Sequence, residues 1–260
     1  METDPQRWMA ALRTSHDRLR ALAGGLDGDG LRQRSYAVEW SIAQVLSHLG
    51  SQAEIFDMFL DSALQDAVPP GAEEFAPIWE RWNAKKPEDQ AAEALVADGR
   101  LVVRVESLDP DERRQVRLEL FGRELDLAGL LQMRLSEHAL HSWDVAVALD
   151  DDARLSPEAV DLLIDTLGPL VGRTGRSLES TAVAVRTTQP ERLFRLESAD
   201  GKLTLVDSAE PTAESSVPMV SLPAEAFVRL IYGRLGADNA AGVQVRGIDL
   251  DELRESFPGF

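Results

Sequence analysis

The sequence predicts a mixed fold in which a four-helix bundle, residues 1–150, is followed by a small α+β domain, residues 151–260. The chain has 260 residues, more than the roughly 100–150 of a typical single domain, so two separate cores are expected. In the first part, apolar residues recur at helical spacing over long stretches. In the second part, short β-type segments are separated by turn residues, which is typical of strands.

Four stretches of the first part have the periodicity and end signals of long helices. Ser41, with Gln44 three residues later, has the arrangement of a capping box at the start of the second one, and Asp126 is a candidate N-cap for the fourth. A shorter helix is expected around residues 78–83. Long connections, rather than hairpin loops, predict a bundle with crossover topology. The four long helices are expected at 5–23, 40–64, 88–108 and 126–149.

The second part begins with a helix-start signal, Ser156-Pro157-Glu158, for a helix at 157–170. The dipeptide Asp200-Gly201, between two β-type segments, is a strong hairpin signal. The sequence therefore predicts an α+β unit with strands at 181–187, 193–198, 203–207, 217–222 and 242–247, and a further helix at 223–235.

The composition excludes several classes of function. The formal net charge is -18 and no dense cluster of Lys and Arg interrupts it, which argues against nucleic acid and anionic membranes as partners. The N-terminal residues METDPQRW lack the features of a secretory signal, so we expect a soluble, cytoplasmic protein, either a monomer or a homodimer. There is no cysteine, which excludes disulfides, thiolate ligands and a protein-borne thiol nucleophile. Any thiol chemistry must use a thiol supplied by a small molecule.

A polar stripe runs along the otherwise apolar fourth helix. Arg134, Glu137, His141 and Asp144 stand at i, i+3, i+7 and i+10, so their side chains lie along one face. Each of these groups would cost roughly 1–3 kcal/mol if it were buried without a partner. The stripe therefore indicates either a face open to solvent or a set of side chains that bind something, and we favour a metal ion.

Glu137 and His141 are four residues apart on this helix, so they can reach one ion together. The third ligand must come from His16, His48 or His138. His48, at the edge of the apolar face of the second helix, fits best; His138 is an alternative, and His16 is interpreted as a surface or helix-edge residue. Two histidines and one carboxylate form a ligand set of catalytic zinc, in which the fourth position stays open. We expect Zn²⁺, or another divalent metal, at His48, Glu137 and His141.

These residues resemble a known signature. The run WSIAQVLSHL at 40–49, together with Glu137, His141, Trp143 and Asp144, is similar to the metal-binding signature of the mycothiol-dependent maleylpyruvate isomerase family, within the wider DinB-like four-helix metalloproteins. The second of the two signatures is the more specific one. The resemblance covers the whole chain, because members of that family carry a helical bundle followed by a small α+β domain similar to sterol-carrier proteins.

The resemblance implies an isomerase or S-transferase that acts on a small electrophilic substrate and uses mycothiol, a low-molecular-weight thiol, as cosubstrate. It also implies an arginine from the C-terminal domain near the active site. We match that arginine to Arg234, with Arg246 as a weaker candidate. Asp144 would support the metal ligands or position the thiol, and Arg134 or Arg234 would meet a substrate carboxylate through bidentate pairing.

Two other functions are compatible with the sequence. The α+β domain could hold a small apolar or amphipathic ligand while the bundle serves as a scaffold, or the bundle could be a metal-dependent hydrolase that activates water and needs no thiol. The sequence identifies neither the substrate nor the metal, and it does not separate isomerisation from thiol transfer.

Overall fold

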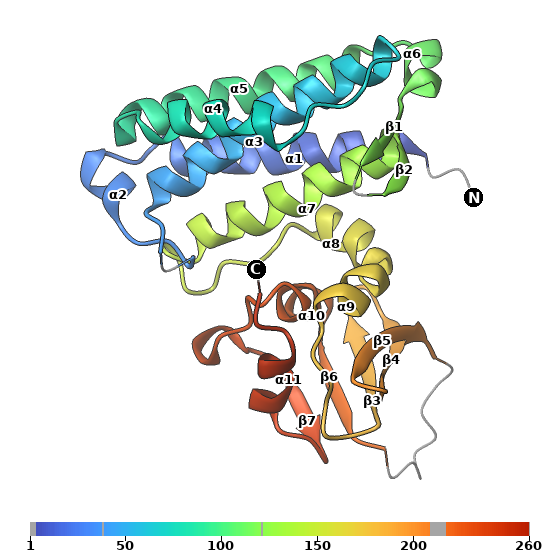
Figure 1. The fold of residues 1–260 in the computed structure, drawn as a ribbon. Coiled ribbons are helices and arrows are strands. Elements are labelled where there is room, and N and C mark those ends of the chain that lie inside the picture. Colours follow the sequence, from blue (N-terminus) through green and yellow to red (C-terminus); the bar gives the residue numbers. More distant parts are fainter. Residues whose placement is uncertain (1–3, 38, 121, 209–216, 260) are drawn as a thin grey trace. The chain divides into compact units, whose positions relative to one another are not determined.

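The computed structural model describes residues 4–37, 39–120, 122–208 and 217–259. The chain divides into two compact units, Met1–Arg154 and Leu155–Phe260. The first is built almost entirely from helices and the second combines helices with a five-stranded sheet (Figure 1). This order of a helical unit followed by an α+β unit confirms the predicted fold class.

Four long helices form the bundle of the first unit: α1 (Pro5–Ala23), α3 (Ile42–Leu64), α5 (Pro87–Ser107) and α7 (Leu127–Ala146). Helix α1 packs against α5 and α7, and α3 packs against the same two helices. Helices α1 and α7 run in one direction, while α3 and α5 run in the other (Figure 1). Helices α3 and α5, which are parallel, are joined by a long connection in which α4 (Ala72–Asn83) returns along α3. The predicted crossover topology is therefore confirmed.

Local signals fix where these helices begin. Ser41 accepts a hydrogen bond from the backbone N–H of Gln44, whose side chain accepts one from the backbone N–H of Ser41, so the predicted capping box is confirmed. Asp126 caps α7 by accepting a hydrogen bond from the N–H of Gly129, 2.8 Å away. Both caps belong to the two helices that carry the predicted metal ligands.

Several short elements were not predicted. Between α5 and α7 lie α6 (Pro110–Gln115) and an antiparallel pair of strands, β1 (Arg117–Leu120) and β2 (Arg123–Asp126), and α2 (Gly28–Arg32) follows α1. Strands of four residues are too short for a clear alternating pattern. Helix α4 begins at Ala72, six residues before the shorter helix expected at 78–83, so that Pro77 lies inside it.

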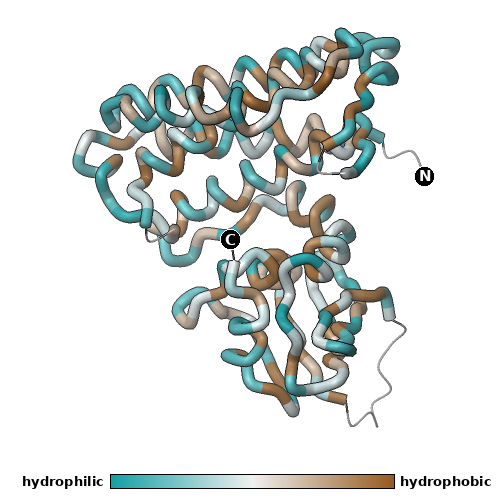
Figure 2. The backbone as a smooth tube through the Cα atoms, viewed as in Figure 1, coloured by the Kyte–Doolittle hydropathy of each residue, from teal (hydrophilic) through white to brown (hydrophobic). Residues whose placement is uncertain are grey.

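The core of the bundle lies between the four long helices. In Figure 2, hydrophobic positions recur between hydrophilic ones along each of them, as expected for helices with one buried face. Gly50 permits one close contact in this core: a Cβ at this position would lie 2.4 Å from the ring of the buried Trp82. None of the described helices combines the length and hydrophobicity that a membrane span requires.

The second unit is built on a sheet with the strand order β5-β4-β3-β6-β7. Strands β3 and β6 are parallel and the remaining neighbours are antiparallel. Asp200 (φ 51°) and Gly201 (φ 73°) both adopt the left-handed conformation that a tight hairpin requires, so this prediction is confirmed. The strands are β3 (Ala182–Thr188), β4 (Arg192–Ala199), β5 (Lys202–Asp207), β6 (Met219–Pro223) and β7 (Gln244–Arg246).

The helices of this unit differ in length from the predicted ones. The helix expected at 157–170 is divided into α8 (Pro157–Leu163), a short 3-10 turn η1 (Ile164–Thr166) and α9 (Gly168–Thr174), because Pro169 cannot continue a helix that precedes it. Helix α10 (Ala224–Ile231) ends earlier than expected, and neither the 3-10 turn η2 (Ala237–Asn239) nor α11 (Leu250–Ser256) was predicted.

Candidate metal centre

The three predicted metal ligands lie together between α3 and α7. His48 is in the second turn of α3, and Glu137 and His141 occupy successive turns of α7. The Nε2 atoms of His48 and His141 lie 3.3 Å and 3.6 Å from Oε2 of Glu137. The two imidazole rings meet edge to face, with 4.7 Å between their centroids. One nitrogen from each ring and one carboxylate oxygen thus face a common point.

The spacing of these atoms fits a bound metal. Ligand atoms about 2.0–2.2 Å from a tetrahedral ion are separated from one another by roughly 3.3 Å. The two observed separations, 3.3 Å and 3.6 Å, are close to that value. The side chain of Glu137 is also 42% exposed, so a small molecule can approach the group from solvent. A donor set with an accessible side is the arrangement of a catalytic rather than a structural zinc site.

Asp144 orients His141. Its buried carboxylate oxygen Oδ2 lies 2.9 Å from Nδ1 of His141. Since a carboxylate only accepts hydrogen bonds, Nδ1 must carry the proton, which leaves the lone pair of Nε2 facing Glu137. The last member of the polar stripe therefore supports one of the predicted ligands and does not itself belong to the group of three.

Trp40 covers the two histidines from one side. The centroid of its ring lies 5.2 Å from that of His48 and 5.9 Å from that of His141, on which it stacks with an angle of 27° between the ring planes. It is held there because it directly precedes Ser41, the N-cap of α3. Sequence reasoning assigned Trp40 no role, although its place at the start of the signature was a signal that could have found it.

The site favours the protonation states that metal ligands need. Burial lowers the pKa of His48, and the neighbouring His141 lowers it further, although the hydrogen bond with Glu137 acts in the opposite direction. Burial alone would raise the pKa of Glu137, but the hydrogen bond with His48 and the proximity of His141 outweigh it and lower the pKa to about 2. At neutral pH the centre therefore offers a neutral imidazole at His48 and a carboxylate at Glu137.

The two other histidines that sequence reasoning considered belong to a second cluster. Nδ1 of His16 lies 2.6 Å and Nε2 of His138 lies 2.9 Å from Oδ2 of Asp98. These separations are those of hydrogen bonds and are shorter than the roughly 3.3 Å between two ligands of one tetrahedral metal. Nδ1 of His138 lies 2.7 Å from Oγ of Ser15 and 3.3 Å from Oγ of Ser142. We therefore interpret this cluster as a hydrogen-bonded network.

The interpretation of His16 as a surface or helix-edge residue is wrong. His16 is only 4% exposed, because it stands four residues after Leu12 and three before Leu19 and so shares their buried face of α1. Sequence reasoning also missed Asp98, which is fully buried on α5. Its position between Ala94 and Leu101 on a buried helix face was the available signal.

Arg134 points into the interior of the bundle. Its side chain is 1% exposed, and its Nη2 donates to Oδ1 of Asp98 at 2.7 Å and to the backbone carbonyl of Leu49 at 3.1 Å. The guanidinium also lies over the ring of Phe56, 5.8 Å from its centroid. This environment favours a supporting role for Arg134 over direct contact with a thiol or a substrate carboxylate.

Comparison with known proteins identifies the family. The model of the mycothiol maleylpyruvate isomerase N-terminal domain matches residues 12–146, just over half of the chain. The chain belongs to this family of enzymes. The matched segment contains the three predicted metal ligands, Asp144 and all members of the buried cluster.

Two solved structures have the same fold as this chain. Two crystal structures align with it at a TM-score of 0.71 and 15% sequence identity, each covering 96% of this chain and 96% of the other. One is of the mycothiol-dependent maleylpyruvate isomerase, and the other is of a mutant of that enzyme in which one histidine is replaced by alanine. No curated protein matches the sequence.

The two candidate arginines of this maleylpyruvate isomerase family member lie in its second unit. Arg234 follows α10 and is half-buried; its Nη1 donates to the carbonyl of Tyr232, and its own carbonyl accepts from Arg229. Gly233 makes this turn possible, because its φ is 70° and a Cβ would lie 2.3 Å from the backbone nitrogen of Gly259. Arg246 is exposed at the end of β7. Arg234 is therefore the more firmly held of the two.

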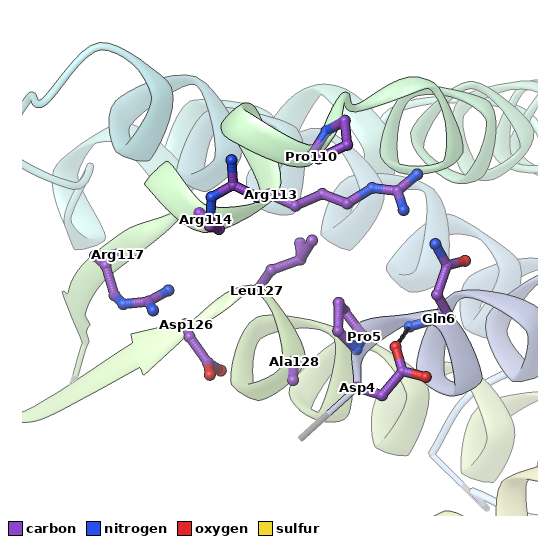
Figure 3. A pocket seen from close by; sticks show the side chains of 10 residues that line it. All are labelled: Asp4, Pro5, Gln6, Pro110, Arg113, Arg114, Arg117, Asp126, Leu127 and Ala128. Atoms are coloured by element: carbon purple, nitrogen blue, oxygen red, sulfur yellow. Dashed lines mark hydrogen bonds between the residues drawn. The ribbon is translucent and has the colours of Figure 1, made fainter. Parts of the chain in front are cut away.

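A separate pocket of about 230 Å³ lies at the other end of the bundle, around the first residues of α1 and α7 (Figure 3). Three arginines from α6 and β1 line it, together with Asp4 and Asp126. Both aspartates already accept hydrogen bonds from the helix N-termini that they cap. The pocket is about 20 Å along α7 from His141, at 1.5 Å per residue, so it is not part of the metal centre.

Proposed function

We propose that the protein is a zinc-dependent, mycothiol-dependent isomerase that acts on a small electrophilic substrate. The observation that carries this proposal is the convergence of His48, Glu137 and His141 around one point with an accessible side. Membership of the family supports a thiol as cosubstrate, and the absence of cysteine from the chain means that the thiol nucleophile must come from outside it. S-transfer to the same class of substrate is the alternative outcome of the same chemistry.

Each residue of the centre has a defined part in this proposal. His48, Glu137 and His141 would hold the metal, which when bound lowers the pKa of a coordinated thiol from its usual value of about 8.5 and so favours the nucleophilic thiolate. Asp144 keeps the proton of His141 on Nδ1, so that Nε2 remains available as a ligand. Trp40 covers the histidine rings and limits the access of water from its side.

The isomerisation itself needs no net oxidation or reduction. The thiolate sulfur forms a bond to one carbon of a cis double bond, and the electron pair of that double bond moves to an adjacent carbonyl group of the substrate. Rotation then occurs about the resulting single bond, and expulsion of the same thiolate restores the double bond in the trans form. We propose that Arg234 pairs with a carboxylate of the substrate, because a guanidinium binds carboxylates in a bidentate manner. We also propose a cytoplasmic location, where low-molecular-weight thiols are kept reduced.

Metal analysis of single variants tests the centre. We expect about one zinc ion per chain in the wild-type protein, and its loss in His48→Ala and in His141→Ala. The variant His16→Asn is the matched control, because His16 belongs to the second histidine-containing cluster and should leave the stoichiometry unchanged. A wild-type chain that binds no zinc would overturn the proposal, and so would loss of the metal in His16→Asn alone.

Thiol dependence is tested by omission. With an activated cis-alkene acid as substrate, turnover should require mycothiol, whereas a metal-dependent hydrolase would turn over without any thiol. Mycothiol should also raise the thermal stability of the zinc-loaded protein, by about 2.7 kcal/mol at a concentration 100 times its Kd, and should do so more than other thiols at equal concentration. Arg234→Lys should lower kcat/KM while leaving the zinc affinity unchanged; equal activity of this variant would remove Arg234 from the site and leave Arg246 to be tested in the same way.

A further inference from the structure

The second cluster, which we call the buried network, consists of Ser15, His16, Asp98, Arg134 and His138. It joins α1, α5 and α7, and Asp98 is at its centre. The two carboxylate oxygens of Asp98 have three partners: Nδ1 of His16 at 2.6 Å, Nε2 of His138 at 2.9 Å and Nη2 of Arg134 at 2.7 Å. Its side chain is 1% exposed, so these contacts replace its hydration almost completely.

The network keeps a charge in the core. Burial alone would raise the pKa of Asp98, but the proximity of His138 and of the Arg134 guanidinium outweighs it and holds the pKa well below its usual value. Arg134 is less well satisfied, because its Nε and Nη1 are buried and have no hydrogen-bond partner among the residues that the structure describes. A buried ion pair of this kind contributes little to net stability compared with a well-packed apolar core, and its best-supported use is to specify geometry.

The geometry that Arg134 specifies lies next to the metal centre. Its Nη2 is shared between Asp98 and the backbone carbonyl of Leu49, the residue that follows His48 on α3. On α7, Arg134 stands three residues before Glu137, so it lies less than one turn from that ligand. The guanidinium therefore connects α3 beside one ligand to α7 beside another, and Asp98 fixes the guanidinium from α5.

We propose that Asp98 and Arg134 are positioning residues for the metal centre: they set the separation of α3 and α7 at the level where His48 faces Glu137. This inference rests on the proposed function, because it assumes that these two residues ligate a metal. A catalytic constellation must be held to within about 0.5 Å, and one ligand of this centre lies on a different helix from the other two. The contact between Arg134 and Leu49 supplies such a restraint from within the core.

Four variants test the proposal in the full-length protein. Asp98→Asn removes the charge and keeps the shape, Arg134→Met removes the tether, and the double variant removes both charges. The control is Gln90→Met, which deletes a different buried hydrogen bond on α5, from Nε2 of Gln90 to the carbonyl of Trp82. For each variant we would measure the Kd for zinc by competition with a chromophoric chelator, the visible spectrum of the cobalt-substituted protein, and the Tm.

Arg134→Met and Asp98→Asn should each weaken zinc binding about tenfold, the lower end of the effect of outer ligands on metal sites, and should shift the cobalt absorption bands. The double variant should regain thermal stability relative to the single ones, since no unpaired charge remains, but it should not regain zinc affinity. Gln90→Met should lower the Tm without changing the Kd or the spectrum. If a single variant fails to fold, the double variant carries the same test.

Three results would overturn the inference. The first is a Kd and a cobalt spectrum that stay at wild-type values in Arg134→Met and in the double variant. The second is recovery of zinc affinity together with stability in the double variant, which would show that only the unpaired charge had mattered. The third is a stoichiometry of two metal ions with loss of one in Asp98→Asn, which would make the buried network a metal site. A wild-type chain without any metal affinity would overturn the proposed function itself, and this distinguishes the two failures.

Discussion

The substitution Asp144→Asn should weaken the metal centre without removing a ligand. The Asp144 carboxylate is buried, and its Oδ2 lies 2.9 Å from Nδ1 of His141. Asparagine has nearly the same shape, but its amide can present either an oxygen or an NH₂ group to the imidazole. If the oxygen faces Nδ1, a charge-assisted hydrogen bond becomes a neutral one of about half the strength. If the NH₂ group faces it, the proton moves to Nε2 and blocks the ligand atom.

Both orientations of the asparagine amide should lower the affinity for zinc. Loss of an outer partner of a metal-ligating histidine typically costs 10–100-fold in metal affinity, which corresponds to about 1.4–2.7 kcal/mol. We expect the zinc Kd of Asp144→Asn to rise within that range. The stoichiometry should remain one ion per chain, because His48, Glu137 and His141 are all still present.

The assay is a chelator competition at fixed pH, with Ser142→Ala as the control. Ser142 lies on the same helix, two residues from Asp144, and its Oγ is 3.3 Å from Nδ1 of His138. Ser142→Ala should bind zinc as the wild type does. An unchanged Kd in Asp144→Asn would refute the reasoning, and so would an equal loss of affinity in the control.

Three further predictions concern stability. Gly50→Ala should destabilise the bundle in urea by about 1–3 kcal/mol, because the added Cβ would lie 2.4 Å from the Trp82 ring, and this exceeds the gain of up to about 1 kcal/mol in helix propensity; a more stable variant would contradict the packing. Because the folded state depresses the pKa of Asp98 below 3.8, its ionisation stabilises the protein above that pH and loses this effect as the pH falls through the depressed value. The difference in unfolding free energy between wild type and Asp98→Asn should therefore narrow from pH 5 to pH 3, and a constant difference would argue against this cause. If the proposed centre holds zinc, removal of the ion with a chelator should lower the Tm of the wild type and leave the Tm of His48→Ala unchanged, because only the wild type has all three proposed ligands; equal shifts in both would place the metal elsewhere.

Features that depend on neighbouring residues could be predicted from the sequence. The caps at Ser41 and Asp126 are satisfied within three residues of themselves, so the starts of α3 and α7 were predictable. The proximity of Glu137 and His141 follows from their spacing on one helix. Choosing His48 as their partner required a comparison of the remaining histidines, and the structure brings His48 to Glu137 across α3 and α7.

Features that depend on distant partners were harder to predict. His16, Asp98 and His138 come from three helices, and nothing near Asp98 in the sequence indicates that two imidazoles and a guanidinium surround it. Arg134 lies on the same stripe of α7 as Glu137. Its guanidinium, however, donates hydrogen bonds to Asp98 and to the Leu49 carbonyl on two other helices, and these contacts place it in the core. The shared helix face therefore predicted correctly on which side of α7 these side chains lie, but it predicted only in part which groups surround them.

The dependence of both polar clusters on α7 has a consequence for how the bundle is made. His48 and Glu137 are 89 positions apart, and Asp98 precedes Arg134 by 36. A ribosome adds residues from the N-terminus at roughly 5–20 per second, so α1, α3 and α5 exist for several seconds before α7 follows them. During that interval the Asp98 carboxylate has neither its guanidinium nor His138, and its burial between α1 and α5 is unfavourable. We therefore expect α1 and α5 to pack stably on each other only after α7 has been synthesised.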